Sequence, residues 1–215
     1  VRDDIAMQGG VDDNEFSHHY VEDAERLWAT AVGADHSRFL VGGSTQGNIA
    51  ALAVVSRPDQ PVAIDRTSHR STQAALIITG ARPIWLHPAL HPDFHLPVGV
   101  PASALDAVTA PVTGFFVTSP SYVGTLTDVV AVSSTAHRRG VPLVVDQAWG
   151  AHLDFMAGRG AIASGADISV TSVHKALMGF SQTAVINSRD PLAARAQVDR
   201  SVDLTSTTSP SGTLL

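Results

Sequence analysis

Short apolar runs alternate along the chain with longer, alanine-rich stretches. The apolar runs occupy residues 39–41, 61–64, 114–118, 141–145, 167–171 and 183–186, and each ends at a polar residue or a glycine. Their apolar character is continuous rather than alternating, as expected for strands that are covered on both faces. Helices are predicted between them, at residues 19–32, 45–56, 69–79, 101–109 and 127–139. This β-α-β-α rhythm predicts an α/β fold, a three-layer α/β/α arrangement around a mostly parallel sheet.

Polar side chains follow the predicted strands at the ends where open α/β sheets bind their ligands. These residues are Ser44, Thr45, His69, Ser119, Asp146, Ser172, His174 and Lys175. Most strands end in a polar turn, which explains any one of these residues but not their particular types. We therefore expect a binding site along this edge of the sheet.

Composition removes several classes of function. The chain has 215 residues, of which 44% are hydrophobic, so it is long enough to bury a large core. Its net charge of −6 offers no basic face to nucleic acid or to an anionic membrane, and no run of about 18 apolar residues could span a bilayer. The absence of cysteine excludes disulfides and thiolate metal sites. Residues 1–4 do not match a signal peptide, and we expect a cytoplasmic protein without nucleic-acid or membrane partners.

The chain contains a single lysine, Lys175. Arginine cannot replace lysine where chemistry needs a primary amine that loses its proton, as in a Schiff base with an aldehyde. Chance survival of one surface lysine explains its position alone equally well. Its neighbours, Ser172 and His174, favour a functional role.

Two further features suggest the chemistry. Residues 42–48 (Gly-Gly-Ser-Thr-Gln-Gly-Asn) follow a strand and begin a helix, where glycines, hydroxyls and free N–H groups can hold a phosphate. A Ser or Thr helix cap explains this segment about as well. Asp146 ends a very apolar strand and could hold a ring nitrogen protonated, or it could simply cap a turn. His87, His91 and His95 do not indicate a metal site, because prolines interrupt the helix that this spacing needs.

Taken together, these features suit pyridoxal 5'-phosphate, and the chain resembles the large domain of the fold-type-I ornithine/lysine/arginine decarboxylase family. The resemblance rests on Asp12 and Asp13, and on residues 33–40, 43–48, 65–71 (Asp-Arg-Thr-Ser-His-Arg-Ser), 119–124 (Ser-Pro-Ser-Tyr-Val-Gly), 146–152 (Asp-Gln-Ala-Trp-Gly-Ala-His), 172–175 (Ser-Val-His-Lys), 181–182 and 207–211. Arg70 departs from it, because the family usually has lysine there.

The resemblance implies a role for each matching residue. Lys175 would form the Schiff base with the cofactor, His69 would stack on the pyridine ring, and Asp146 would pair with the ring nitrogen. Ala148 would lie against the other face of the ring. The phosphate would be bound by Ser44, Thr45, Ser172, Gln46 and His174, and His174 could also steer protons near the Schiff base.

The implied function is decarboxylation of a basic amino acid: arginine, lysine or ornithine. We expect residues 1–215 to form a single cofactor-binding large domain of a homodimer, truncated before the C-terminal small domain of the relatives. Two alternatives stay open, namely an aminotransferase on the same fold and a truncated cofactor-binding protein without activity. Asp154 is a candidate for the rim of the substrate pocket or, equally, a solvated loop residue, and Trp149 could face the cofactor.

Overall fold

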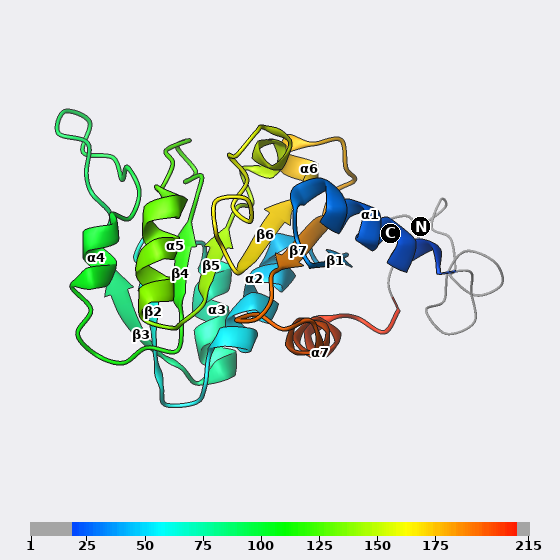
Figure 1. Cartoon of the computed structure of the whole chain (residues 1–215), viewed down its shortest axis with the longest axis horizontal. Helices are drawn as coiled ribbons and strands as arrows, with labels where there is room; N and C mark the ends of the chain where they lie inside the picture. The colour runs from blue at the N-terminus through cyan, green and yellow to red at the C-terminus, as the bar shows by residue number, and fades with distance from the viewer. Residues whose placement is uncertain (1–18, 210–215) are drawn as a thin grey trace.

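A seven-stranded sheet forms the middle layer of the computed structural model, which describes residues 19–209 (Figure 1). In chain order the strands are β1 (His36–Leu40), β2 (Pro61–Asp65), β3 (Arg82–Leu86), β4 (Phe115–Thr118), β5 (Leu143–Asp146), β6 (Ile168–Ser172) and β7 (Ala184–Ser188). Their order across the sheet is β1-β7-β6-β5-β4-β2-β3. The strands β3, β2, β4, β5 and β6 pair in parallel, and β7 is antiparallel to both of its neighbours, β6 and β1. The predicted mostly parallel α/β fold is confirmed.

Helices cover both faces of the sheet (Figure 1). They are α1 (Tyr20–Val32), α2 (Gly43–Val55), α3 (Arg70–Thr79), α4 (Ala102–Asp106), α5 (Val129–Arg138), the 3-10 helix η1 (Ala151–Phe155), α6 (Val173–Ala176) and α7 (Arg195–Thr205). One core cluster joins α2, α3 and α7 to the sheet through side chains such as Leu52, Ile64 and Val198. The other joins α4 and α5 to the opposite face through Leu105 and Val132.

The predicted elements agree with the structure in kind, with one strand missed. β3 was not among the predicted strands, because Pro83 interrupts it and its first two residues are exposed. Proline is tolerated at the edge of a sheet, and β3 is an edge strand. The helices η1, α6 and α7 were also not predicted. Asp12, Asp13 and residues 210–211, which contribute to the resemblance, lie outside the described residues.

Helix α2 is positioned by its close contact with the sheet. A Cβ atom on Gly47 would lie 2.5 Å from Cγ1 of Val170 in β6 and 2.8 Å from Cδ1 of Leu40 in β1. Only glycine permits this approach, which brings the first turns of α2 next to the ends of the central strands.

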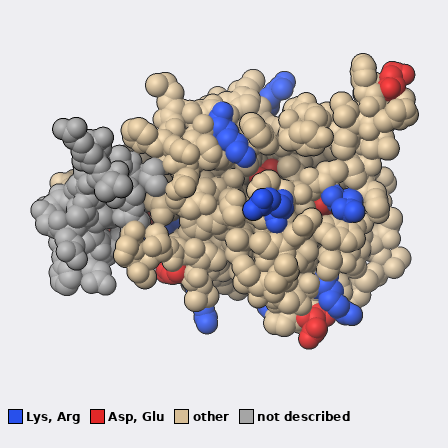
Figure 2. Space-filling view, turned by 180° about the vertical axis from the view of Figure 1, so that it is seen from behind, with Lys and Arg blue, Asp and Glu red and all other residues tan. Residues whose placement is uncertain are grey.

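Charge is sparse on the surface. Figure 2 shows one face of the molecule, on which Lys and Arg side chains are scattered among neutral residues rather than gathered in one patch. Across residues 19–209, every helix is too short or too polar to cross a bilayer.

Candidate active site

The carboxyl ends of all strands except β7 lie at one edge of the sheet, here the edge that runs across the strand ends rather than along an outer strand. β7 is antiparallel to both β6 and β1, so β1 runs in the same direction as the central strands. This edge therefore brings together the turn after β1 at residues 42–45, His69 beyond β2, Asp146 at the end of β5, and residues 172–175 at the end of β6. The structure thus gathers the predicted site residues along one edge of the sheet.

A chain of hydrogen bonds, buried at Asp146 and partly buried at His69, joins these two residues. Asn48 Nδ2 donates to Asp146 Oδ2 at 2.8 Å and to Ser71 Oγ at 3.0 Å. Ser71 Oγ lies 2.9 Å from His69 Nδ1, and the Ser71 N–H also donates to that nitrogen. The backbone N–H of Ala148 donates to Asp146 Oδ1 at 3.0 Å. Asp146 and the ring of His69 are therefore held in a fixed relation to each other.

Burial governs the acidity of Asp146. The residue is only 2% exposed, and this burial raises the pKa of its carboxyl group. The hydrogen bonds from Ala148 and Asn48 and the charges of Lys175 and His69 act in the opposite direction but do not overcome it. A buried carboxylate of this kind gains most from a cationic partner, because the partner offsets the cost of leaving water.

Lys175 lies in α6, directly after β6. Its Nζ is 4.4 Å from the centre of the Trp149 ring, a cation–π distance, and Trp149 is 47% exposed. Lys175 is exposed as well, so its amine is accessible at the same edge as Asp146. Trp149 therefore faces the amine of Lys175, the predicted Schiff-base residue.

His174 and Ser172 form a second polar pair at the end of β6. His174 Nδ1 lies 3.1 Å from the carbonyl oxygen of Thr183 and 3.3 Å from Ser172 Oγ. A carbonyl only accepts, so Nδ1 carries a proton and the other ring nitrogen is left to exchange one. His174 is half-buried, whereas Ser172 is fully buried.

The turn after β1 has unused hydrogen-bond donors. Gly43 adopts a φ of 69° and donates its N–H to the carbonyl oxygen of Gln182 at 2.8 Å. Within residues 19–209 the backbone N–H groups of Ser44 and Thr45 have no protein acceptor, which is usual in the first turn of a helix. Gln46 differs from them, since its side chain is buried and hydrogen-bonded inside the protein.

Asp154 is a partly buried acid rather than a solvated loop residue. It belongs to η1, and its Oδ2 accepts a hydrogen bond from Thr171 Oγ1 in β6 at 3.4 Å. Burial raises the pKa of Asp154 to about 6, against the opposing effects of Gln147, Thr171 and His152. The solvated-loop interpretation was wrong, and a role at a substrate pocket stays a prediction.

Two clefts flank the site. A cleft of about 290 Å³ lies beside Trp149 and is also lined by Tyr122 and His152. A larger, mainly apolar cleft of about 650 Å³ lies beside the lysine segment and is lined by side chains that include Trp28 and Phe180. Asn48 and Ser71 were not predicted to be site residues, although they lie within the motifs at residues 43–48 and 65–71.

Known proteins resemble the chain throughout its length. The family described as "Orn/Lys/Arg decarboxylase, major domain" matches residues 2–215. An arginine decarboxylase of Halalkalibacterium halodurans is 31% identical over 217 residues, which cover 99% of this chain and 44% of that protein. An arginine decarboxylase of Bacillus subtilis is 32% identical over 95% of this chain and 43% of its own length. The chain thus spans less than half of these relatives.

Solved structures agree on the fold. Lysine decarboxylase A from Pseudomonas aeruginosa superposes with a TM-score of 0.75 at 24% identity, covering 90% of this chain and 30% of that one. The lysine decarboxylase LdcF of Francisella novicida gives the same TM-score at 20% identity, over 90% of this chain and 29% of that one.

Proposed function

Because the chain belongs to the ornithine/lysine/arginine decarboxylase family, whose major domain it matches, we propose that it is the cofactor-binding domain of a decarboxylase acting on arginine, lysine or ornithine. The observation that carries the proposal is the hydrogen-bond chain from Asp146 through Asn48 and Ser71 to His69, beside the single lysine. Pyridoxal 5'-phosphate, when bound, supplies an electron sink for the pair left behind as CO₂ departs.

The donor set fits this cofactor. Burial raises the pKa of the Asp146 carboxyl group, and a protonated ring nitrogen would be a cationic partner that offsets this cost. Ser44 and Thr45 offer free N–H groups and hydroxyls to a phosphate at the positive end of α2. The exposed ring of His69 offers a flat surface for stacking.

Each residue then has a distinct task. Lys175 Nζ would hold the cofactor through its aldehyde, and Asp146 would keep a proton on the ring nitrogen. Ala148, which is buried beside Asp146, would support the other face of the ring. His174 would hold or move a proton close to Lys175 through Nε2, because its Nδ1 is engaged by the carbonyl oxygen of Thr183.

Release of CO₂ tests the proposed function. The purified chain, supplied with pyridoxal 5'-phosphate, is expected to release CO₂ from one of the three basic amino acids and not from neutral ones. The depth of the pocket selects the length of the substrate side chain, since one methylene group changes the binding free energy by about 1–3 kcal/mol. Amine transfer to a keto acid without CO₂ release would instead identify an aminotransferase. No detectable reaction with any of these substrates, despite bound cofactor, would identify a cofactor-binding protein without activity.

Replacing His69 by asparagine is expected to weaken cofactor binding without unfolding α3. His69 is the N-cap of α3 and accepts from the Ser71 N–H, a task that asparagine also performs well. The ring itself is lost, and stacking of about 0.5–1.5 kcal/mol corresponds to a roughly 2- to 12-fold rise in Kd. Cofactor titration checks the affinity and urea unfolding checks the fold. Unchanged affinity in a folded His69→Asn variant would remove His69 from the site.

A homodimer is proposed as well, supported by large apolar side chains that are exposed beside the lysine. Met178 is fully exposed and Phe180 is 68% exposed, and side chains of this kind in solvent favour an interaction surface. Light scattering is expected to give twice the chain mass of 22.5 kDa. Met178→Glu should shift the protein toward monomer. Ile77→Glu is the matched control, because it also replaces an exposed apolar side chain by a carboxylate, but on α3 rather than beside the lysine, and it should leave the mass unchanged. A wild-type monomer that still holds cofactor would count against the dimer.

A further inference from the structure

The side chain of Gln46 bridges the start of α2 and the end of α7. We propose that Gln46 and Ser206 are positioning residues that fix the turn at residues 42–45 in the shape that receives a phosphate group. This inference rests on the proposed function, since it assigns the phosphate of the cofactor to that turn. It gives Gln46 an indirect role, on the loop backbone, in place of direct contact with the phosphate.

Both ends of the Gln46 amide are engaged. Its Oε1 accepts the backbone N–H of Gly42 at 2.9 Å, and its Nε2 donates to Ser206 Oγ at 2.6 Å. The side chain is only 7% exposed. A Cβ atom on Gly42 would lie 2.7 Å from Gln46 Oε1, so glycine at this position is what lets the amide lie against the backbone. The contact resembles one half of a capping box, in which a side chain of the first helical turn holds the N–H of the N-cap residue.

These bonds decide which donors of the turn are left for a ligand. The N–H of Gly42 is taken by Gln46, and the N–H of Gly43 is taken by the carbonyl oxygen of Gln182. The N–H groups of Ser44 and Thr45, which no protein atom of the described part accepts, remain. A turn held in this way has its free donors oriented before the ligand arrives, and such preorganisation raises affinity because less freedom is lost on binding.

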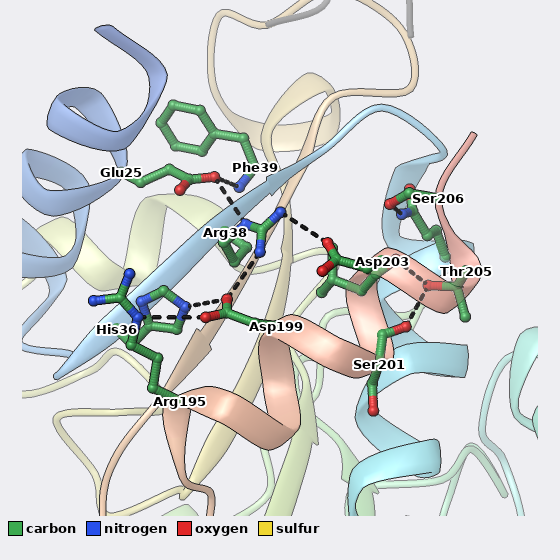
Figure 3. Close-up of polar contacts among 12 residues, drawn as sticks. Glu25, His36, Arg38, Phe39, Arg195, Asp199, Ser201, Asp203, Thr205 and Ser206 are labelled. Atoms are coloured by element: carbon green, nitrogen blue, oxygen red, sulfur yellow. Dashed lines mark hydrogen bonds and ion pairs between the residues drawn. The ribbon is translucent and has the colours of Figure 1, made fainter. Parts of the chain in front are cut away.

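The partner of Gln46 is itself held firmly. Ser206 directly follows α7, which packs against α2 through the buried residues Val198 and Val202. Figure 3 shows the polar contacts that tie α7 to β1: Asp199 accepts from His36 Nε2 at 2.7 Å and from Arg38 Nη1 at 2.8 Å.

Two further ion pairs of Arg38 extend this network. Its guanidinium reaches Asp203 at 3.3 Å and Glu25 of α1 at 3.4 Å. Burial opposes the charge on Asp199, but Arg38 and His36 together lower the pKa of that carboxyl group. The end of α7 is therefore fixed relative to β1, the strand that leads into the phosphate turn.

Ser206→Ala tests the inference. Without the hydroxyl, Gln46 Nε2 has lost its acceptor in a buried place, so the amide is expected to reorient and release Gly42. We expect the Kd for pyridoxal 5'-phosphate to rise roughly 3- to 10-fold, the effect of losing one buried hydrogen bond. The Kd for pyridoxal, which lacks the phosphate, should change by less than about 2-fold, which corresponds to a few tenths of a kcal/mol. A purely structural defect would weaken both compounds alike.

Matched variants complete the experiment. Ser206→Thr keeps the hydroxyl and should bind like wild type. Thr205→Val removes a neighbouring hydroxyl that, among residues 19–209, bonds only to the α7 backbone at Ser201 and Val202. This variant should also bind like wild type. Gln46→Met should reproduce the effect of Ser206→Ala, and urea unfolding of each variant without cofactor reports whether it folds.

Two results would overturn the inference. One is an unchanged ratio of the two affinities in Ser206→Ala, and the other is an equal loss in Thr205→Val. If wild-type protein binds neither compound, the proposed function itself fails, and this inference fails with it. That outcome is seen in the wild type alone and is therefore distinguishable from failure of the inference.

Discussion

Lys175→Ala is expected to abolish CO₂ release, with turnover lower by roughly 10³- to 10⁶-fold, because removal of a covalent catalytic group has effects of that order. The chain has no second lysine to take over the role. Steady-state assays with saturating cofactor would measure the loss, and the visible absorbance of the bound cofactor should disappear with it.

Lys175→Arg is the matched control for the charge. Arginine keeps a cation over the Trp149 ring, where Nζ now lies 4.4 Å from the ring centre, but it cannot condense with an aldehyde. Both variants should therefore be equally inactive. Activity in Lys175→Arg would show that the positive charge, rather than the amine, is what the site uses.

Asp146→Asn is expected to lower turnover by roughly 10²- to 10³-fold, the usual effect of removing one preorganised electrostatic contact. Asparagine keeps the shape and can still accept the N–H of Ala148 through its oxygen. Two effects on stability oppose each other: the variant removes a charge that burial disfavours, but it also places an NH₂ group opposite Asn48 Nδ2, which donates to Asp146 Oδ2 in the wild type. Loss of activity without loss of stability would mark Asp146 as a functional rather than a structural acid.

Asp167→Asn is the control for Asp146→Asn. Asp167 is also buried and accepts from Leu143 N at 2.8 Å and from His137, but it precedes β6 and so lies at the opposite end of the sheet. We expect this variant to change stability while leaving turnover within about 2-fold, as for a site distant from the chemistry. Full activity in Asp146→Asn would contradict the assignment of Asp146 to the ring nitrogen.

The pattern of apolar runs was enough to predict the central strands, because strands that are buried on both faces have few polar residues. β5, with all four residues buried, is the clearest case. β3 was missed because an exposed edge strand that contains proline has no such pattern. α7 was missed because few of its side chains, chiefly Val198 and Val202, reach the core.

The candidate site was predictable only in part. Lys175, Asp146 and His69 could be noticed in the sequence, because strand ends there combine the single lysine, a carboxyl group after a very apolar strand and an imidazole ring. The bonds between site residues could not, since Asn48 and Asp146 lie 98 residues apart, and Gln46 and Ser206 lie 160 apart. Such pairs depend on how α2 packs on the sheet and against α7, which no local pattern specifies.

Reduction with borohydride, followed by mass spectrometry of the peptides, tests the proposed Schiff base most directly. Wild-type protein reduced in the presence of pyridoxal 5'-phosphate is expected to carry the cofactor on Lys175 and to lose this modification in Lys175→Arg. Reduced protein with an unmodified Lys175, or with the cofactor attached to another amine, would contradict the account.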